Sequence, residues 1–295
     1  MTAPRKRPRS LPLADGQRGS FRHDGSRIGI VPADVRGPFA TVRRIVFAVL
    51  VAVLVLLPWL RVGGRPAVLL DVANRRFFLL GLTLNAQDAW LLFFVVTGVG
   101  FGLVYVTTLL GRVFCGWACP QTVFLEGVYR RIERAVLGSK EARKRRQKHG
   151  HRGLEALRVL ALHALYVLVS FALAHVFLGY FVSPPALLEI VRMAPSRSPE
   201  AFAWTAAMTV ALYGNFAWFR EQLCVIVCPY GRLQSALVDA DTMIVGYDAK
   251  RGEPRGKAKE PGAGDCVDCG RCVAVCPTGI DIRDGLQLEC VGCTA

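Results

Sequence analysis

The chain has 295 residues, of which 53% are hydrophobic, and its mean hydropathy of +0.35 is too high for an ordinary soluble protein. Its formal net charge is +15 at pH 7. We expect this charge to lie beside membrane spans and on no nucleic-acid recognition element. We therefore predict contact with anionic lipid headgroups and exclude nucleic acid as a partner.

Four apolar segments are each about long enough to cross a hydrocarbon core of roughly 30 Å. They lie at 45–60, 89–110, 159–182 and 201–219. The first has only sixteen residues and could be taken for a signal-peptide core, but no small-residue cleavage site follows it. The sequence therefore predicts a retained anchor and a multi-pass membrane protein with about four transmembrane helices.

The distribution of basic residues predicts the orientation in the membrane. Residues 1–44 hold ten Lys or Arg and residues 111–158 hold twelve, whereas the loops at 61–88 and 183–200 together hold six. Short cytoplasmic loops are enriched in Lys and Arg. We therefore predict a bacterial inner-membrane protein with both ends of this chain in the cytoplasm. The basic run 140–152 is interpreted as solvated charge that serves this topology.

Two cysteine pairs with the same spacing follow the second and the fourth apolar segments. They are Cys115-Gly-Trp-Ala-Cys119-Pro and Cys224-Val-Ile-Val-Cys228-Pro. On a helix, residues four apart share a face, so each pair would present two sulfurs in one direction. Four thiolates suffice for a 4Fe-4S cluster or a tetrahedral zinc site, and a dithiol could instead do redox work or bind Cu(I). Small buried cysteines at span ends are the structural alternative.

Apolar residues recur mostly at four-residue steps over 123–136, with arginines between them. This pattern predicts an amphipathic helix that lies along the inner membrane face or packs onto other protein. Farther on, residues 230–240 predict a short helix and 242–247 a strand. The stretch 249–264, rich in Gly, Pro and Lys, predicts a linker.

The third apolar segment contains two histidines, His163 and His175. Twelve residues place them about 18 Å apart along one helix, so one haem cannot bind both. We expect hydrogen-bonded interior histidines, with a quinol or proton site as the alternative.

The C-terminal region carries a C-x2-C-x2-C-x3-C-P run, whose spacing is that of bacterial ferredoxins. Its ligands are Cys266, Cys269, Cys272 and Cys276. In such modules three thiolates bind one 4Fe-4S cluster and the fourth reaches a second cluster, which a matching run completes. A matching run begins at Cys290 and Cys293, and the chain ends two residues later. We therefore expect a C-terminally truncated chain with an incomplete two-cluster module.

All ten cysteines fall on the predicted cytoplasmic side or at its membrane surface. Thiols stay reduced in that compartment, so metal binding or redox chemistry is favoured over a disulfide framework. The predicted fold is a membrane α-helical protein with a cytoplasmic α+β ferredoxin module for two 4Fe-4S clusters. Its predicted regions are a basic segment (1–44), a membrane domain (45–220), a juxtamembrane segment (221–248), a linker (249–264) and a partial ferredoxin domain (265–295).

Several motifs around the cysteines resemble one known family along nearly the whole chain. They are GRVFCGWACPQTVF at 111–124, CPY at 228–230, DTMIV at 241–245, RGEPRG at 251–256 and CPTGIDIRDGLQ at 276–287. These motifs are similar to those of the cytochrome c oxidase accessory proteins of the CcoG/FixG/RdxA type. The chain departs from the family pattern at a few positions, none of which is a cysteine: Asn85, Gly231, Leu233 and Leu288.

The resemblance implies a membrane iron–sulfur protein that helps to assemble a haem-copper respiratory oxidase by reducing Cu(II) to Cu(I). Copper would be its substrate, and oxidase subunits or copper-delivery proteins its partners. On this hypothesis Cys266, Cys269 and Cys272 hold one cluster in the full-length parent. The second cluster takes ligands from Cys276, Cys290 and Cys293.

The pairs Cys115/Cys119 and Cys224/Cys228 would then form a membrane-proximal site that holds a further cluster or handles copper. Such a protein would be a one-electron oxidoreductase, with a cytoplasmic donor or quinol supplying the electrons. Two alternatives remain. One is a quinol dehydrogenase subunit that feeds a periplasmic reductase, and the other is a non-catalytic assembly scaffold.

Overall fold

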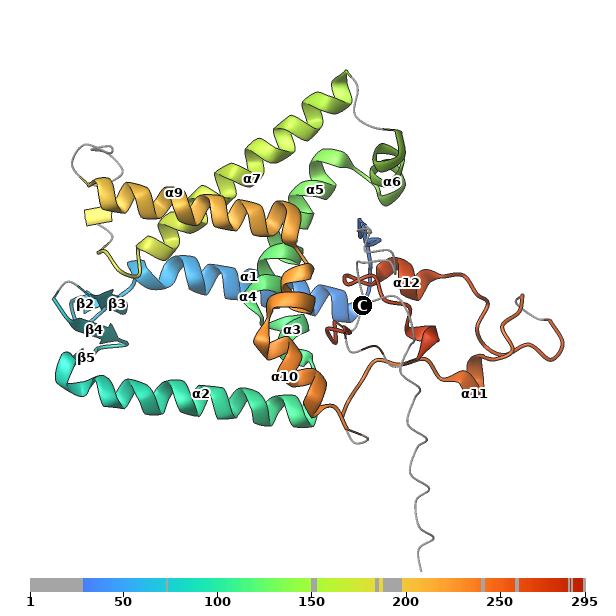
Figure 1. Ribbon diagram of the computed structural model, residues 1–295, viewed down its shortest axis with the longest axis horizontal. Coiled ribbons are helices and arrows are strands. Elements are labelled where there is room, and N and C mark those ends of the chain that lie inside the picture. Colours follow the sequence, from blue (N-terminus) through green and yellow to red (C-terminus); the bar gives the residue numbers. More distant parts are fainter. Residues whose placement is uncertain are drawn as a thin grey trace, which may run out of the picture. The chain divides into compact units, whose positions relative to one another are not determined.

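The computed structural model describes residues 29–72, 74–149, 153–183, 186–187, 198–239, 242–257, 260–285, 287 and 289–293. Most of the predicted basic N-terminal segment and part of the predicted loop at 183–200 lie outside these residues. The chain divides into two compact units (Figure 1). The cysteine unit comprises Met1–Arg43, Leu103–Cys119 and Glu221–Ala295, and the helical unit comprises Arg44–Gly102 and Pro120–Arg220. All ten cysteines belong to the cysteine unit.

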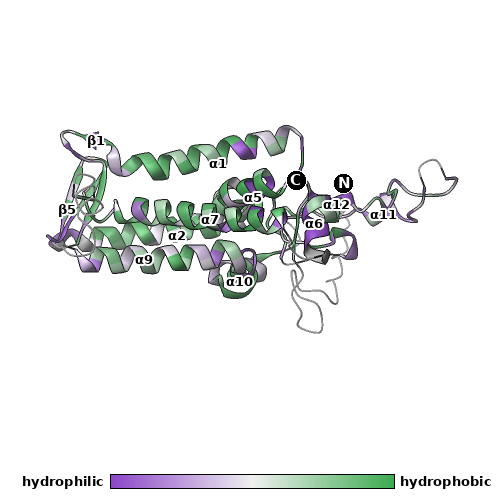
Figure 2. Ribbon diagram, turned by 90° about the horizontal axis from the view of Figure 1, so that it is seen from above, coloured by the Kyte–Doolittle hydropathy of each residue, from purple (hydrophilic) through white to green (hydrophobic). Residues whose placement is uncertain are grey.

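Three helices are long and apolar enough to cross a membrane. Helix α1 (Pro38–Leu56) continues into the 3-10 turn η1 (Leu57–Trp59), and the other two are α2 (Ala89–Leu110) and α7 (Leu154–Leu178). Figure 2 shows them as mostly hydrophobic ribbons. The first three predicted spans are therefore present as helices. Helix α1 begins seven residues earlier than the predicted segment and includes Arg43 and Arg44.

The fourth predicted span forms helix α9 (Pro199–Gly214), which continues into the π-helical turn η4 (Asn215–Phe219). Its regular part has 16 residues, fewer than the roughly 20 that usually cross a bilayer. Within the described residues the candidate spans therefore number three, and a fourth crossing remains a prediction.

The core of the helical unit lies where α7 and α9 pack against the helical segment after Cys119. That segment consists of α4 (Pro120–Phe124), the π-helical turn η3 (Leu125–Tyr129) and α5 (Arg130–Leu137). The ring of Tyr129 stacks on Phe216 with 4.4 Å between centroids, and its hydroxyl lies 2.8 Å from Ser170 Oγ. The segment 123–136 packs onto protein, with Phe124, Leu125 and Tyr129 in the core and Val128, Ile132 and Val136 partly buried against it. A position along the inner membrane face remains a prediction.

The predicted external loop at 61–88 contains strands that the sequence analysis did not anticipate. Strands β1 (Arg61–Val62) and β2 (Arg65–Pro66) form a small ribbon. Strands β3 (Val68–Asp71), β4 (Arg76–Leu79) and β5 (Leu82–Asn85) form an antiparallel meander that leads through the 3-10 turn η2 (Ala86–Asp88) into α2. The basic run after α5 forms helix α6 (Lys140–His149), the most hydrophilic helix in Figure 2.

The cysteine unit is built from short helices. They are α3 (Val113–Trp117), the π-helical turn η5 (Leu223–Val227), α10 (Pro229–Leu237), α11 (Ala249–Gly252), α12 (Arg271–Val275) and the 3-10 turn η6 (Ile282–Asp284). Helix α10 confirms the helix predicted after Cys228, although it ends three residues earlier than predicted.

The strand predicted at 242–247 is wrong, and the described part of 221–293 contains no strand. Valine and isoleucine favour extended backbone, but a strand also needs a neighbouring chain to form its hydrogen-bond ladder. Residues Thr242–Val245 instead lie beside the end of α2, where the carbonyl oxygen of Met243 approaches Gly111. The β part of the expected α+β ferredoxin module is therefore not seen in these residues.

Candidate metal centre

The two C-x3-C-P motifs have the same local structure. Cys115 lies in α3, and Cys224 lies in the π-helical turn η5. The second cysteine of each pair, Cys119 or Cys228, lies just beyond the helical turn and directly before the helix that the proline begins. The prediction that each pair occupies one face of a continuous helix is therefore wrong.

The proline explains this break. A proline disfavours helical backbone at the residue before it, while its own fixed φ suits the first position of a helix. In both motifs the N–H of the second cysteine donates to the carbonyl five residues earlier: from Cys119 to Phe114 and from Cys228 to Leu223, each at 2.8 Å. The repeat seen in the sequence is thus also a repeat of backbone geometry.

The two cysteine pairs lie close enough to influence each other electrostatically. Burial raises the pKa of Cys115 to about 12; Cys119 and Cys228 raise it and Arg112 lowers it. Burial is also the largest of the effects that raise the pKa of Cys224 to about 12. Cys119, Cys115 and Cys228, in that order, add to this rise. The four thiols, predicted to act together, are therefore neighbours in the fold.

A buried hydrogen-bond network surrounds the thiol of Cys115. Its Sγ donates to Oε1 of Gln234 at 3.1 Å, and Gln234 has no exposed surface. Nε2 of Gln234 donates to Thr107 Oγ1 at 3.2 Å, and that hydroxyl lies 2.7 Å from the hydroxyl of Tyr230. The network joins α2, α3 and α10 around one cysteine.

Arg112 is the cation nearest to this group of thiols. Its Nη2 donates to the carbonyl of Gly231 at 2.5 Å and to the hydroxyl of Ser235. Its charge lowers the pKa of both Cys115 and Cys290 against the larger effect of burial. Sequence reasoning assigned no role to Arg112 or Gln234, although Arg112 belongs to a motif that carries the family resemblance.

The cysteine run near the end of the chain also reaches α3. A Cβ on Gly116 would lie 2.5 Å from the carbonyl oxygen of Val291 and 2.8 Å from that of Gly292. Only glycine allows this approach without a clash. Burial raises the pKa of Cys290, and Cys276 raises it too, so the ferredoxin run is adjacent to the second run.

The remaining cysteines of the ferredoxin run lie around α12. Cys272 lies within that helix and Cys276 directly follows it, with its Sγ 3.3 Å from Thr278 Oγ1. Cys269 is exposed, whereas Cys266 and Cys293 are half-buried. The segment before α1 supports α12 through a 2.7 Å hydrogen bond from the N–H of Ala33 to the carbonyl of Ala274.

All ten cysteines lie among the described residues, and none is in a disulfide. Among the described residues, no three His, Cys, Asp or Glu side chains are arranged to hold one metal ion. The donor set itself is all sulfur and fits 4Fe-4S clusters, which are held by cysteine thiolates.

The histidines in α7 are half-buried and hydrogen-bonded, as expected. Nδ1 of His163 lies 3.0 Å from the hydroxyl of Tyr213, and Nδ1 of His175 lies 2.9 Å from the carbonyl oxygen of Phe171. Both belong to the helical unit, whereas all the cysteines belong to the other unit.

Comparison with known families supports the assignment of the cysteine motifs. The 4Fe-4S dicluster domain family matches residues 219–295, and a 4Fe-4S binding domain family matches residues 89–144. The second match is informative because it includes the first C-x3-C-P motif. The helices and these domains define a membrane iron–sulfur electron-transfer protein.

Comparison with curated relatives identifies the family within this class of membrane iron–sulfur proteins. The chain is 36% identical to protein RdxA of Cereibacter sphaeroides, over 90% of this chain and 58% of the relative. It is 38% identical to the nitrogen fixation protein FixG of Rhizobium meliloti, over 90% of this chain and 52% of the relative. It is also 35% identical to RdxB of Cereibacter sphaeroides, over 88% and 56% respectively. No solved structure matches significantly.

The chain belongs to the family of FixG and RdxA, of the CcoG type. It spans about half the length of the curated relatives that it matches.

Proposed function

We propose that this protein assists the assembly of a haem-copper cytochrome c oxidase by reducing Cu(II) to Cu(I) at the cytoplasmic side of the inner membrane. The observation that carries the proposal is the mutual proximity of Cys115, Cys119, Cys224 and Cys228 next to the ferredoxin-type cysteines. An ordinary ferredoxin has no such membrane-edge thiols, as we call the four cysteines of the two C-x3-C-P motifs that follow predicted membrane spans. The role in oxidase assembly rests on the motif resemblance to the accessory proteins.

The ferredoxin-type cysteines are the proposed cluster ligands. Cys266, Cys269 and Cys272 hold one 4Fe-4S cluster, and Cys276, Cys290 and Cys293 contribute to a second. A bound 4Fe-4S cluster supplies electrons singly, which is the number that reduction of Cu(II) to Cu(I) requires. Among these thiols, that of Cys290 is half-buried, and the nearby charge of Arg112 lowers its pKa against the larger effect of burial and so favours its thiolate form.

The four membrane-edge thiols form the proposed site at which electrons leave the protein or copper is handled. Cys115 and Cys224 have pKa values of about 12, so without a metal their thiols are protonated at neutral pH. Binding of Cu(I) as a thiolate complex therefore releases protons. Thiolate is a soft ligand and prefers Cu(I) to harder cations. A further cluster on the same four thiolates is the other occupant that fits.

The orientation of the chain in the membrane and the identity of its partners are also part of the proposal. The basic residues at 1–44 and 111–158 favour a cytoplasmic location for both ends of the chain. Oxidase subunits or copper-delivery proteins would receive the Cu(I). A cytoplasmic reductant or a membrane quinol would supply the electrons.

The test is anaerobic purification of the full-length protein, followed by iron and sulfide counts and an assay of Cu(II) reduction with a Cu(I)-specific chelator. Chemically reduced, cluster-replete protein should reduce one Cu(II) per electron stored. The variants Cys115→Ser and Cys224→Ser should lose that activity while keeping the ferredoxin-type clusters. Ala118→Ser is the matched control, because it adds the same hydroxyl beside Cys119 and removes no thiol.

Three other outcomes would overturn the proposal or favour one of the alternative functions. Absence of Cu(II) reduction by cluster-replete protein would overturn the proposal. Rapid cluster reduction by a quinol would favour the quinol dehydrogenase alternative. If the two variants lower protein abundance and oxidase assembly together without a specific loss of Cu(II) reduction, the protein acts as a scaffold.

A further inference from the structure

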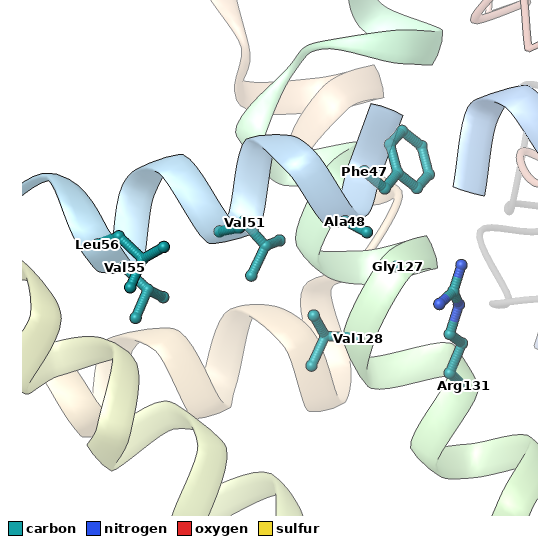
Figure 3. A pocket seen from close by; sticks show the side chains of 9 residues that line it. Phe47, Ala48, Val51, Val55, Leu56, Gly127, Val128 and Arg131 are labelled. Atoms are coloured by element: carbon teal, nitrogen blue, oxygen red, sulfur yellow. The ribbon is translucent and has the colours of Figure 1, made fainter. Parts of the chain in front are cut away.

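The helical unit contains an apolar groove that the iron–sulfur chemistry does not use. It lies between α1 and the helical segment of η3 and α5, with a volume of about 450 Å³, within the range of ligand pockets. Its apolar lining is mostly aliphatic, and its one charged lining residue is Arg131. Figure 3 shows Arg131 at the end near Phe47 and Gly127, whereas Val55 and Leu56 lie at the other end.

The charged end of the groove carries an excess of positive charge. Burial lowers the pKa of Arg131, and the neighbouring charges of Arg44 and Arg134 lower it further, which means that these cations repel one another. The nearby carboxylate of Glu126 forms ion pairs with Arg130 and Arg134. In the described part of the chain no carboxylate pairs with Arg131. An anion at this position would relieve the repulsion.

The apolar end extends in the direction expected for an acyl chain. Helix α1 is a candidate membrane span, and Arg44 lies in its first two turns. From Ala48 to Leu56 the groove follows the helix for about 12 Å at 1.5 Å per residue. A molecule with an anionic head and an apolar tail therefore matches both the charge and the direction of the groove.

We propose that this groove is a binding site for an anionic phospholipid, with its phosphate between Arg131 and Arg44 and one acyl chain along α1. Basic pockets between transmembrane helices on the cytoplasmic side are known to bind lipid headgroups in this way. A neutral quinone would fill the apolar part of the groove but would bring no anion to Arg131. A protein helix as the occupant of the groove would need an acidic side chain at the level of Arg131 to match its charge.

The site can be tested by native mass spectrometry of the full-length protein, purified, delipidated and mixed with phosphatidylglycerol or phosphatidylcholine. We expect preferential retention of phosphatidylglycerol. The variant Arg131→Gln should weaken retention of phosphatidylglycerol about fivefold, which is the effect of one basic residue near a lipid surface. It should leave retention of phosphatidylcholine unchanged. Arg158→Gln, at an exposed position on α7, is the charge-matched control.

A second pair of variants tests the apolar end. Ala52→Trp fills the groove and should reduce retention of phosphatidylglycerol, whereas Val53→Trp, on the outward face of α1, should not. Unchanged thermal unfolding of both variants excludes misfolding as the cause. Equal retention of both lipids, no effect of Arg131→Gln, or displacement of the lipid by a ubiquinone or by free phosphate at equal concentration would overturn the proposal.

Discussion

The thiol of Cys115, which is half-buried, donates a hydrogen bond of 3.1 Å to the side-chain amide of the fully buried Gln234. In the free protein the thiol is the donor and Oε1 of the amide accepts. When Cys115 becomes a thiolate ligand, it can only accept. An amide side chain has a donor and an acceptor at equal reach, so a half-turn of Gln234 lets Nε2 donate to the sulfur. The hydroxyl of Thr107, which donates to the carbonyl of Leu103 at 2.7 Å, must turn from that carbonyl to donate to Oε1.

This relationship predicts that Gln234 tunes a redox centre held by Cys115. Hydrogen bonds to cluster sulfurs raise the reduction potential because they stabilise the more negative, reduced state. The variant Gln234→Leu should therefore lower the potential on the order of 50 mV, since a hydrogen bond to a charged group is worth about 1.5–3 kcal/mol and acts on both redox states. Redox titration followed by electron paramagnetic resonance gives the value.

Gln222→Leu is the matched control, because Gln222 is also buried in the same unit and no hydrogen bond joins it to a cysteine. Equal potentials in Gln234→Leu and wild type would contradict the role given to Gln234.

The close approach at Gly116 predicts a different defect. The variant Gly116→Ala would place its Cβ 2.5 Å from the backbone oxygen of Val291, and backbone cannot move aside as a flexible side chain can. We expect the 290–293 segment to move away from α3 and the iron content per protein to fall, as measured by iron and sulfide analysis. Gly98→Ala in α2 should bind wild-type amounts of iron, because nothing lies within 4 Å of its Cβ position.

The sequence was sufficient to predict the features that depend on local pattern. Apolar runs of sufficient length gave three of the helices, because a chain in lipid must satisfy its backbone hydrogen bonds within the segment. The fixed cysteine spacings and the prolines after them gave the repeated motif. The proline also shows why the helix-face interpretation was wrong, since α3 ends at Trp117, before Cys119, and the next helix begins at Pro120.

The environment of the site depends on contacts between distant segments, which pattern alone does not reveal. Gln234 and Cys115 are 119 residues apart, and their contact requires α2, α3 and α10 to pack together. The strand predicted at 242–247 failed for the same reason, because pairing depends on a partner that local residues do not specify.

The proposed orientation predicts the labelling pattern of single cysteines introduced in the loop after the first span and in the basic segment after the second. The cysteine of Gly63→Cys, in the turn between β1 and β2, should react with a membrane-impermeant maleimide in intact spheroplasts. The cysteine of Ser139→Cys, before α6, should react only after the cells are opened, because the basic segment after α5 is retained in the cytoplasm. Wild-type protein labelled in the same way gives the background from the native cysteines, and equal labelling of both variants in intact spheroplasts would contradict the orientation.

The last prediction concerns the buried carboxylate of Glu133 in the core of the helical unit. Burial alone would raise its pKa, but Arg220, Arg143 and Arg130 together outweigh that effect and lower it below 4.5. Oε2 of Glu133 accepts from Arg220 at 2.9 Å, and Oε1 accepts from Arg143 at 3.4 Å. Glu133→Gln should destabilise the protein by about 3–5 kcal/mol, since it leaves buried arginines without their anion.

The same ion pairs predict how the stability of the helical unit depends on pH. A carboxylate whose pKa is lower in the folded state stabilises the fold fully above its unfolded value of 4.5, and this contribution is lost as the pH falls through the folded value. Thermal unfolding in detergent should therefore show that wild-type protein loses stability below about pH 4.5. The variant Glu133→Gln should be less stable at neutral pH and should lack the part of the acid-induced loss that comes from protonation of Glu133. Glu200→Gln, an exposed position in the first turn of α9, should keep the wild-type profile. Parallel profiles for wild type and Glu133→Gln across this range would show that Glu133 is not the group whose protonation weakens the core.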